Sequence, residues 1–235
     1  ASPGRLAAAA RLAADRGLTG PVAEVAIRRA AELTAYQDAK LAGRYLDLVA
    51  VAAQAEAELA GSASAVGGAM AEAVMEGYFH LLAYKDEYEV ARLHLLPEFD
   101  AALAAAVAGG RGVRYRLHPP MLRALGLRKK IAIPAAVARP AFRVLAAMRR
   151  VRGTPVDVFG YARVRRTERR LAAEYDAEIR AVLTGLSAVS HATAVELARL
   201  PLAIRGYEEI KLAAVERYEA DRVRLRAILA TVASR

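Results

Sequence analysis

The chain has 235 residues, no cysteine and a formal net charge of +10. The missing cysteine excludes disulfides, thiolate zinc sites and cysteine-held iron–sulfur clusters from this chain, and it fits a cytoplasmic protein. No apolar run is long enough to span a membrane. Alanine, leucine, arginine and valine dominate the composition, which predicts a mainly α fold.

The first half of the chain predicts helices with clear end signals. Residues 21–60 carry apolar side chains at helical spacing, which fits one long helix or two shorter ones. Ser62 or Ser64 can cap a second helix that ends near Pro97. A short helix is then expected over residues 97–110.

The pattern changes in the middle of the chain. The segment VRYRLH (113–118) alternates apolar and basic residues, as a half-exposed strand does, and RKKIAI (128–133) is its expected partner in a hairpin. Pro140 is expected to begin a helix that runs to Val151, and the turn-rich residues 152–160 to form a loop.

Three further helices are expected at 161–183, 192–200 and 207–232. The fold class predicted for the whole chain is a mainly α bundle of six to eight helices with a short β-hairpin near 113–133. We expect residues 1–235 to form a single helical domain.

The segment LLAYKDEYEVARL (81–93) concentrates charge within a hydrophobic chain. On a helix, Lys85, Glu89 and Arg92 follow one another at spacings of three and four residues, which fits a salt-bridged, solvated face. The alternative is a polar cleft that binds a small anion such as a 2-oxoacid or an acyl-CoA. The residues expected to line such a cleft are Lys85, Glu89, Arg92, Arg205 and Lys211.

Residues 111–170 hold 17 Lys and Arg but only 2 Asp and Glu. So basic a segment is either a solvated arginine-rich surface or a surface that attracts an acidic protein, a phosphate-bearing ligand or nucleic acid. Nucleic acid is the least favoured of these, because few aromatic residues are interleaved with the arginines. The candidate docking residues are Arg149, Arg150, Arg152, Arg165, Arg166 and Arg169.

Sequence signatures of catalysis are missing. There is no GxSxG, no P-loop and no GxGxxG behind a strand, and the four histidines lack metal-ligand spacing. We therefore nominate no catalytic residue and no metal ligand in this chain.

Five blocks of the sequence resemble a known family in their order along the chain. They are LTAYQDAKLAGRYLDLV (33–49), LLAYKDEYEVARLH (81–94), HPPML (118–122), RGTPVDVFGYARVRRTERRL (152–171) and VELARLPLAIRGYEEIK (195–211). Together they look like the C-terminal helical domain of the indolepyruvate ferredoxin oxidoreductases, a branch of the 2-oxoacid:ferredoxin oxidoreductases. The segment YEEIK (207–211) departs from the family pattern, which indicates a diverged branch.

The resemblance implies a larger enzyme that converts 2-oxoacids oxidatively to acyl-CoA and passes the electrons to ferredoxin. It also implies that thiamine diphosphate, magnesium and iron–sulfur clusters are bound by partner domains or subunits. These partners would be of the thiamine-binding and γ types. This chain would be a C-terminal part or a separate subunit of that oligomeric assembly and would bind none of these cofactors. Its role would be to support the assembly and to dock ferredoxin or coenzyme A. A stand-alone small-anion-binding protein and a nucleic-acid-binding module remain as alternatives.

Overall fold

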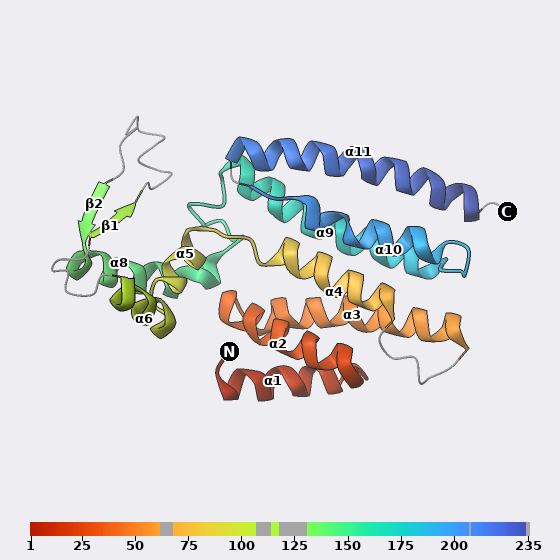
Figure 1. Cartoon of the computed structure of the whole chain (residues 1–235), viewed down its shortest axis with the longest axis horizontal. Coiled ribbons are helices and arrows are strands. Elements are labelled where there is room, and N and C mark those ends of the chain that lie inside the picture. Colours follow the sequence, from red (N-terminus) through yellow and green to blue (C-terminus); the bar gives the residue numbers. More distant parts are fainter. Residues whose placement is uncertain (62–67, 107–113, 118–130, 207, 234–235) are drawn as a thin grey trace. The chain divides into compact units, whose positions relative to one another are not determined.

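The computed structural model describes residues 1–61, 68–106, 114–117, 131–206 and 208–233 (Figure 1). The described part is mainly α, as predicted, with ten α-helices and one two-stranded antiparallel sheet. The described helices outnumber the six to eight expected. The segment expected at 21–60 and the one expected to end near Pro97 each form two helices, and a helix over Pro3–Ala14 was not predicted.

The chain divides into two compact units. The helical unit consists of Ala1–Tyr84 and Gly153–Arg235, and the inserted unit consists of Lys85–Arg152. The inserted unit therefore interrupts the sequence of the helical unit, and the chain passes between them at residues 84–85 and 152–153.

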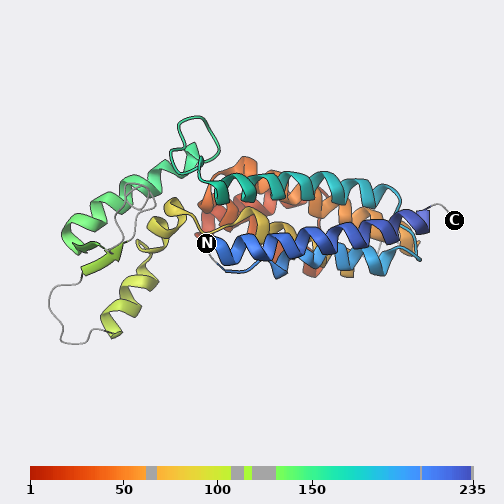
Figure 2. The same cartoon turned by 90° about the horizontal axis from the view of Figure 1, so that it is seen from above.

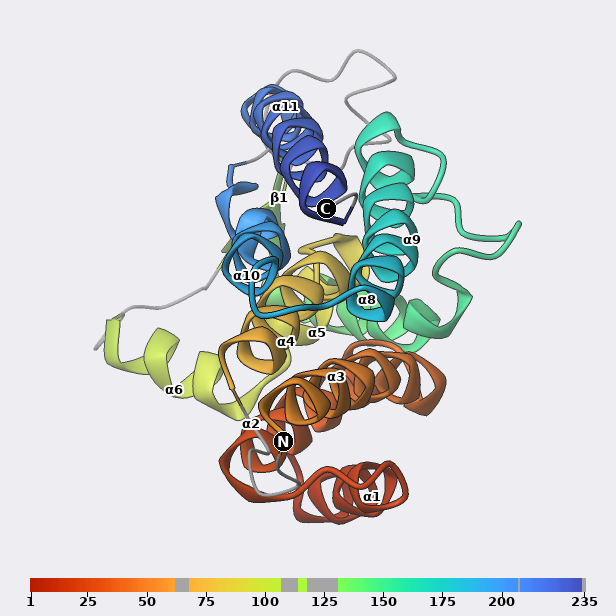
Figure 3. The ribbon, with the colours of Figure 1, turned by 90° about the vertical axis from the view of Figure 1, so that its right-hand side faces the viewer.

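Seven described α-helices and one 3-10 helix form the helical unit. They are α1 (Pro3–Ala14), α2 (Gly20–Tyr36), α3 (Ala39–Ala60), α4 (Ala69–Leu82), α9 (Arg163–Thr184), α10 (His191–Arg199), η2 (Leu200–Ala203) and α11 (Glu208–Ala233). Helix α4 packs against α3 on one side and against α9 and α10 on the other (Figure 3). Helices α9 and α11 run alongside each other in the view of Figure 2, and α10 packs against α11.

Residues 21–60, for which the sequence allowed one long helix or two shorter ones, form two helices. Gln37 leaves the helical conformation, and Asp38 takes up an extended one, from which its carboxylate accepts a hydrogen bond from the backbone N–H of Leu41 at 2.8 Å. This bond caps α3 by satisfying one of the free N–H groups of its first turn. Gly61 ends α3 with a φ of 67°, a left-handed conformation that glycine adopts without steric cost.

Tyrosines fill the centre of the helical unit. The rings of Tyr45 and Tyr78 lie 6.3 Å apart and those of Tyr78 and Tyr175 lie 5.6 Å apart, both in stacked arrangements. The hydroxyl of Tyr175 donates to the carbonyl of Ala198 at 2.8 Å, which satisfies the polar end of a buried ring. Burial raises the pKa of Tyr175 well above its ordinary value. These rings tie α3, α4, α9 and α10 together.

Helix α4 approaches α10 closely at Gly77. A Cβ atom placed on Gly77 would lie 2.2 Å from the carbonyl oxygen of Ala198 and 2.8 Å from the hydroxyl of Tyr175. Only glycine fits this contact without displacing the backbone of α10.

The inserted unit contains α5 (Glu87–Leu93), α6 (Pro97–Ala106), β1 (Arg114–Leu117), β2 (Ile131–Pro134), α8 (Ala135–Ala147) and the 3-10 helix η1 (Met148–Val151). Strands β1 and β2 form the predicted hairpin, with Tyr115 opposite Ile133. The ring of His94 lies among those of Phe99, Tyr115 and Phe142, with centroid distances of 4.6, 5.6 and 5.1 Å. This small aromatic core joins α5, α6 and α8 to the hairpin.

The prediction that Pro140 begins a helix is wrong. Helix α8 begins at Ala135, behind the extended Pro134, and Pro140 lies inside it. At this interior position Pro140 lacks the N–H that would bond the carbonyl of Ala136, which costs stability, but its fixed φ is helical and α8 continues through it. The expected caps Ser62 and Ser64 lie outside the described residues, and Gly68 is the N-cap of α4.

No helix in the described ranges is long and apolar enough to cross a membrane.

Candidate functional site

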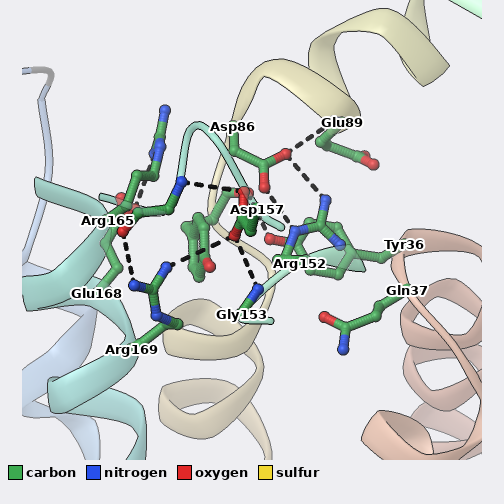
Figure 4. Close-up of polar contacts among 12 residues, drawn as sticks. Tyr36, Gln37, Asp86, Glu89, Arg152, Gly153, Asp157, Arg165, Glu168 and Arg169 are labelled. Carbon is green, nitrogen blue, oxygen red and sulfur yellow. Dashed lines mark hydrogen bonds and ion pairs between the residues drawn. The ribbon is translucent and has the colours of Figure 1, made fainter. Parts of the chain in front are cut away.

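Asp86 and Arg152 form a buried ion pair at the two ends of the inserted unit (Figure 4). The Nε of Arg152 donates to Oδ2 of Asp86 at 2.5 Å and Nη2 donates to Oδ1 at 2.9 Å. Both side chains are 3% exposed. The guanidinium also lies over the ring of Tyr88, 5.5 Å from its centroid. A two-pronged, charge-assisted pair of this kind fixes both partners in position.

Asp86 also caps helix α5. Its Oδ1 accepts a hydrogen bond from the backbone N–H of Glu89 at 2.8 Å, so one carboxylate serves both the helix end and the guanidinium of Arg152. Within α5, Arg92 is held by two hydrogen bonds from its guanidinium to the carboxylate of Glu89, at 2.8 and 2.7 Å. Lys85 precedes the helix and is exposed.

The loop 153–162 of the helical unit is organised around the buried carboxylate of Asp157. Its Oδ2 accepts from the backbone N–H of Gly153 at 2.8 Å, and its Oδ1 accepts from that of Gly160 at 3.0 Å. The guanidinium of Arg169 donates to the carbonyl of Gly160 at 2.6 Å and lies 3.8 Å from Asp157 (Figure 4). A Cβ on Gly160 would lie 2.4 Å from Oδ2 of Asp157, so this loop conformation requires glycine at position 160.

Glu168 is the third buried carboxylate of these segments. It lies on α9 and accepts a hydrogen bond from Nη1 of Arg165 at 2.8 Å. It also accepts one from the ammonium group of Lys211 on α11. The guanidinium of Arg165 lies 5.7 Å from the centroid of the Tyr84 ring. Glu168 thereby joins α9 to α11 through a residue 43 positions further along the chain.

The predicted docking arginines divide into two groups. Arg152, Arg165 and Arg169 bind the carboxylates or carbonyls described above. Arg149 donates to the carbonyl of Ala146 at 3.0 Å. The side chains of Arg150 and Arg166 are exposed and have no hydrogen-bond or ion-pair partner in the part of the chain that is described.

The predicted anion-binding residues are also divided. Lys85, Glu89 and Arg92 belong to the inserted unit, and Arg205 and Lys211 belong to the helical unit. Glu89 neutralises Arg92, and Glu168 neutralises Lys211. The guanidinium of exposed Arg205 donates to the carbonyl of Leu202 at 3.1 Å.

A separate polar group, which the sequence did not indicate, surrounds Glu56. The carboxylate of this buried residue on α3 accepts from the backbone N–H groups of Met70 and Ala71 at the start of α4, at 3.1 and 3.2 Å. It also lies 2.7 Å from Nε2 of His191. An open depression of about 340 Å³ is lined by Glu56, Leu59, Ala188 and His191. Among the described residues, no three His, Cys, Asp or Glu side chains are arranged to hold a metal ion.

Sequence reasoning proposed the arginines but missed the buried carboxylates that hold them. Two of them carried a local signal: Asp157 lies in a turn with glycine on both sides, and Asp86 precedes Glu89 by three residues, as the N-cap of a helix does. Asp86 and Glu168 bind cations 66 and 43 residues away, which no local pattern indicates.

The comparisons with known proteins give one match. No curated protein matches the chain, and no solved structure does. A model for a family described as a family of unknown function, DUF6537, matches residues 22–224. This match covers most of the helical unit and the whole inserted unit, including the buried carboxylates of Glu56, Asp86, Asp157 and Glu168, and the chain therefore belongs to the DUF6537 family.

Proposed function

We propose that this chain is a non-catalytic helical part of a cytoplasmic 2-oxoacid:ferredoxin oxidoreductase, where it supports the assembly and attracts an acidic partner. The proposal rests first on the resemblance of the blocks at 81–94 and 152–171 to the corresponding domain of the indolepyruvate ferredoxin oxidoreductases.

One structural observation supports an architectural role for those two blocks. The buried carboxylates that they contribute, those of Asp86, Asp157 and Glu168, all bind cations or backbone groups of this same chain. Their carboxylates are already satisfied, and they fix the ends of the inserted unit, the loop 153–162 and the pairing of α9 with α11. Residues used in this way preserve a shape, which is what an assembly domain requires.

The side chains of this chain do not fit the iron–sulfur clusters of such an enzyme. Iron–sulfur clusters are held by cysteine thiolates, and the sequence has no cysteine. In this proposal, thiamine diphosphate, magnesium and the clusters belong to thiamine-binding and γ-type domains or subunits.

Exposed positive charge supports the other part of the proposal, that the chain attracts an acidic partner. Arg150 of the inserted unit and Arg166 of the helical unit are each exposed and unpaired within the described ranges, in a sequence segment with a large positive excess. Ferredoxins are acidic, and opposite charges accelerate the encounter of two proteins. Coenzyme A, which carries phosphates, is the second anionic partner that this positive charge would attract.

Native co-purification tests the proposal. The chain is tagged in its own cells and purified at low salt, and the recovered polypeptides are identified by mass spectrometry. We expect thiamine-binding and γ-type oxidoreductase polypeptides, or their sequences joined to this chain. Recovery of the chain by itself, from cells that express the oxidoreductase, would contradict membership of the assembly.

A further inference from the structure

Three large apolar side chains of the loop 153–162 point into solvent within six residues. The exposed fractions of Val156, Val158 and Tyr161 are 65%, 51% and 64%. A single exposed valine is ordinary, but apolar side chains gathered on one short segment are typical of a surface that another molecule covers.

The same loop is held rigidly from within. Asp157 binds the backbone N–H groups of Gly153 and Gly160, and Arg169 binds the carbonyl of Gly160. The exposed Tyr161 is itself fixed, because its hydroxyl donates to the carbonyl of Pro155 at 2.7 Å. A loop that is already ordered loses little conformational entropy on binding, so its apolar area contributes more fully to affinity.

Positive charge follows the loop directly. Arg163 and Arg166 lie in the first turn of α9, are exposed, and have no side-chain partner among the residues described. The first turn of α9 contains no acidic residue. Cations at the N-terminus of a helix oppose the helix dipole and cost stability, so their charge is available to an anionic partner.

We propose that Val156, Val158 and Tyr161 form the apolar anchor of a docking surface for an acidic protein, with Arg163 and Arg166 as its charged rim. The partner would present an apolar depression bordered by aspartate and glutamate. This inference rests on the proposed function, which supplies ferredoxin as the acidic protein. A membrane surface is less well matched, because three side chains of this size give little affinity for lipid without a second anchor.

The test is a binding titration of the full chain with purified ferredoxin, at about 20 mM and about 200 mM salt. The variant Val156→Ser/Val158→Ser should weaken binding about tenfold or more at both salt concentrations. The matched control is Val189→Ser, which alters a valine that is 75% exposed elsewhere in the helical unit. We expect this control to leave the affinity unchanged.

A charge reversal separates the rim from the anchor. Arg166→Glu should weaken binding several-fold at low salt and much less at high salt, because screening shortens the range of surface charges. It places a carboxylate at the N-terminus of α9, so the thermal midpoint should not fall. Arg28→Glu, an exposed arginine of α2 without a partner in the described part, is the matched control.

Three outcomes would overturn the inference. The first is that wild-type chain does not bind ferredoxin at low salt, and the second is that the double serine variant binds as tightly as Val189→Ser. The third is that the loop variants leave ferredoxin binding intact and abolish a different interaction, either self-association or sedimentation with phosphatidylcholine–phosphatidylserine vesicles. Co-purification with the oxidoreductase polypeptides is measured separately, so the proposed function can stand while this inference fails.

Discussion

Asp86 and Arg152 lie 66 residues apart in the sequence and form an ion pair with two hydrogen bonds, which joins the two ends of the inserted unit. One partner follows the point where the chain enters the unit, and the other is the last residue before it leaves. Because both side chains are buried, the loss of either charge would leave the other buried without a counter-charge. The two ends of the unit would then no longer be held together by this pair.

The first prediction concerns this pair. Asp86→Asn leaves the guanidinium of Arg152 buried without its counter-charge, and should lower the free energy of unfolding by about 3–5 kcal/mol. Urea denaturation, with hydrogen exchange to localise the loss to the inserted unit, measures it. Asp86→Leu/Arg152→Met removes both charges and should recover much of the loss.

The control for this prediction is a partly exposed pair of the same unit. Arg139 donates to both carboxylate oxygens of Asp100, at 2.6 and 3.0 Å, and lowers the pKa of that carboxyl. Water solvates the separated charges of such a pair, so Asp100→Asn should cost far less than Asp86→Asn. Equal losses in the two variants would show that the burial of the Asp86–Arg152 pair is energetically irrelevant.

The second prediction concerns the bridge between α9 and α11. Glu168→Gln removes the buried negative charge that Arg165 and Lys211 share, and should cost about 2–3 kcal/mol and increase hydrogen exchange in the first turns of α11. Glu219→Gln is the matched control, because the exposed pair of Arg170 and Glu219 joins the same two helices. We expect it to cost less than about 1 kcal/mol.

The third prediction concerns the close approach of α4 to α10. Gly77→Ala should lower the free energy of unfolding by about 1–3 kcal/mol, since the added methyl group meets the backbone of Ala198. Gly185→Ala is the control, because a Cβ there has no atom within 4 Å among those described. A fully stable Gly77→Ala protein would mean that the two helices are further apart than in this structure.

The fourth prediction concerns alkaline pH. Burial raises the pKa of Tyr218 from 10.0 to about 12, against the opposing effect of Arg222. The unfolded chain therefore loses this proton before the folded chain does, so the stability contributed by Tyr218 is complete below pH 10 and is lost as the pH rises from about 10 to 12.

Tyr218→Phe tests the fourth prediction. The variant should lose less stability across this window, by about 1 kcal/mol per pH unit, because one raised tyrosine pKa contributes roughly that slope. Chemical denaturation at a series of pH values from 9 upward measures it. Identical slopes for the two proteins would show that the hydroxyl of Tyr218 is as well solvated in the folded chain as in the unfolded one.

Much of the fold could be predicted because its signals are local. Pro97 begins α6 as expected, and the alternation of VRYRLH identified the strand that pairs Tyr115 with Ile133. The division between α2 and α3 was left open, because helical spacing continues through Gln37 and Asp38 and only the capping bond to Leu41 marks the break.

The candidate site was harder to predict because its bonds are long-range. An arginine-rich segment shows charge, but whether an arginine is free or bound depends on a carboxylate brought to it by folding. Arg152 and Arg166 are alike in the sequence, yet one is buried against Asp86 and the other is exposed. The anchor proposed at Val156 and Val158 was also missed, because the sequence does not show whether a valine in a loop is buried or exposed after folding.

The measurement that tests the central claim most directly is ferredoxin reduction by the assembly recovered with the tagged chain. The eluate is supplied with coenzyme A, thiamine diphosphate, magnesium and ferredoxin, and a panel of 2-oxoacids is added in turn. The account predicts reduction that depends on at least one 2-oxoacid and is removed when the chain is depleted with its tag. An eluate that contains the chain in quantity, and reduces ferredoxin with none of the 2-oxoacids, would contradict it.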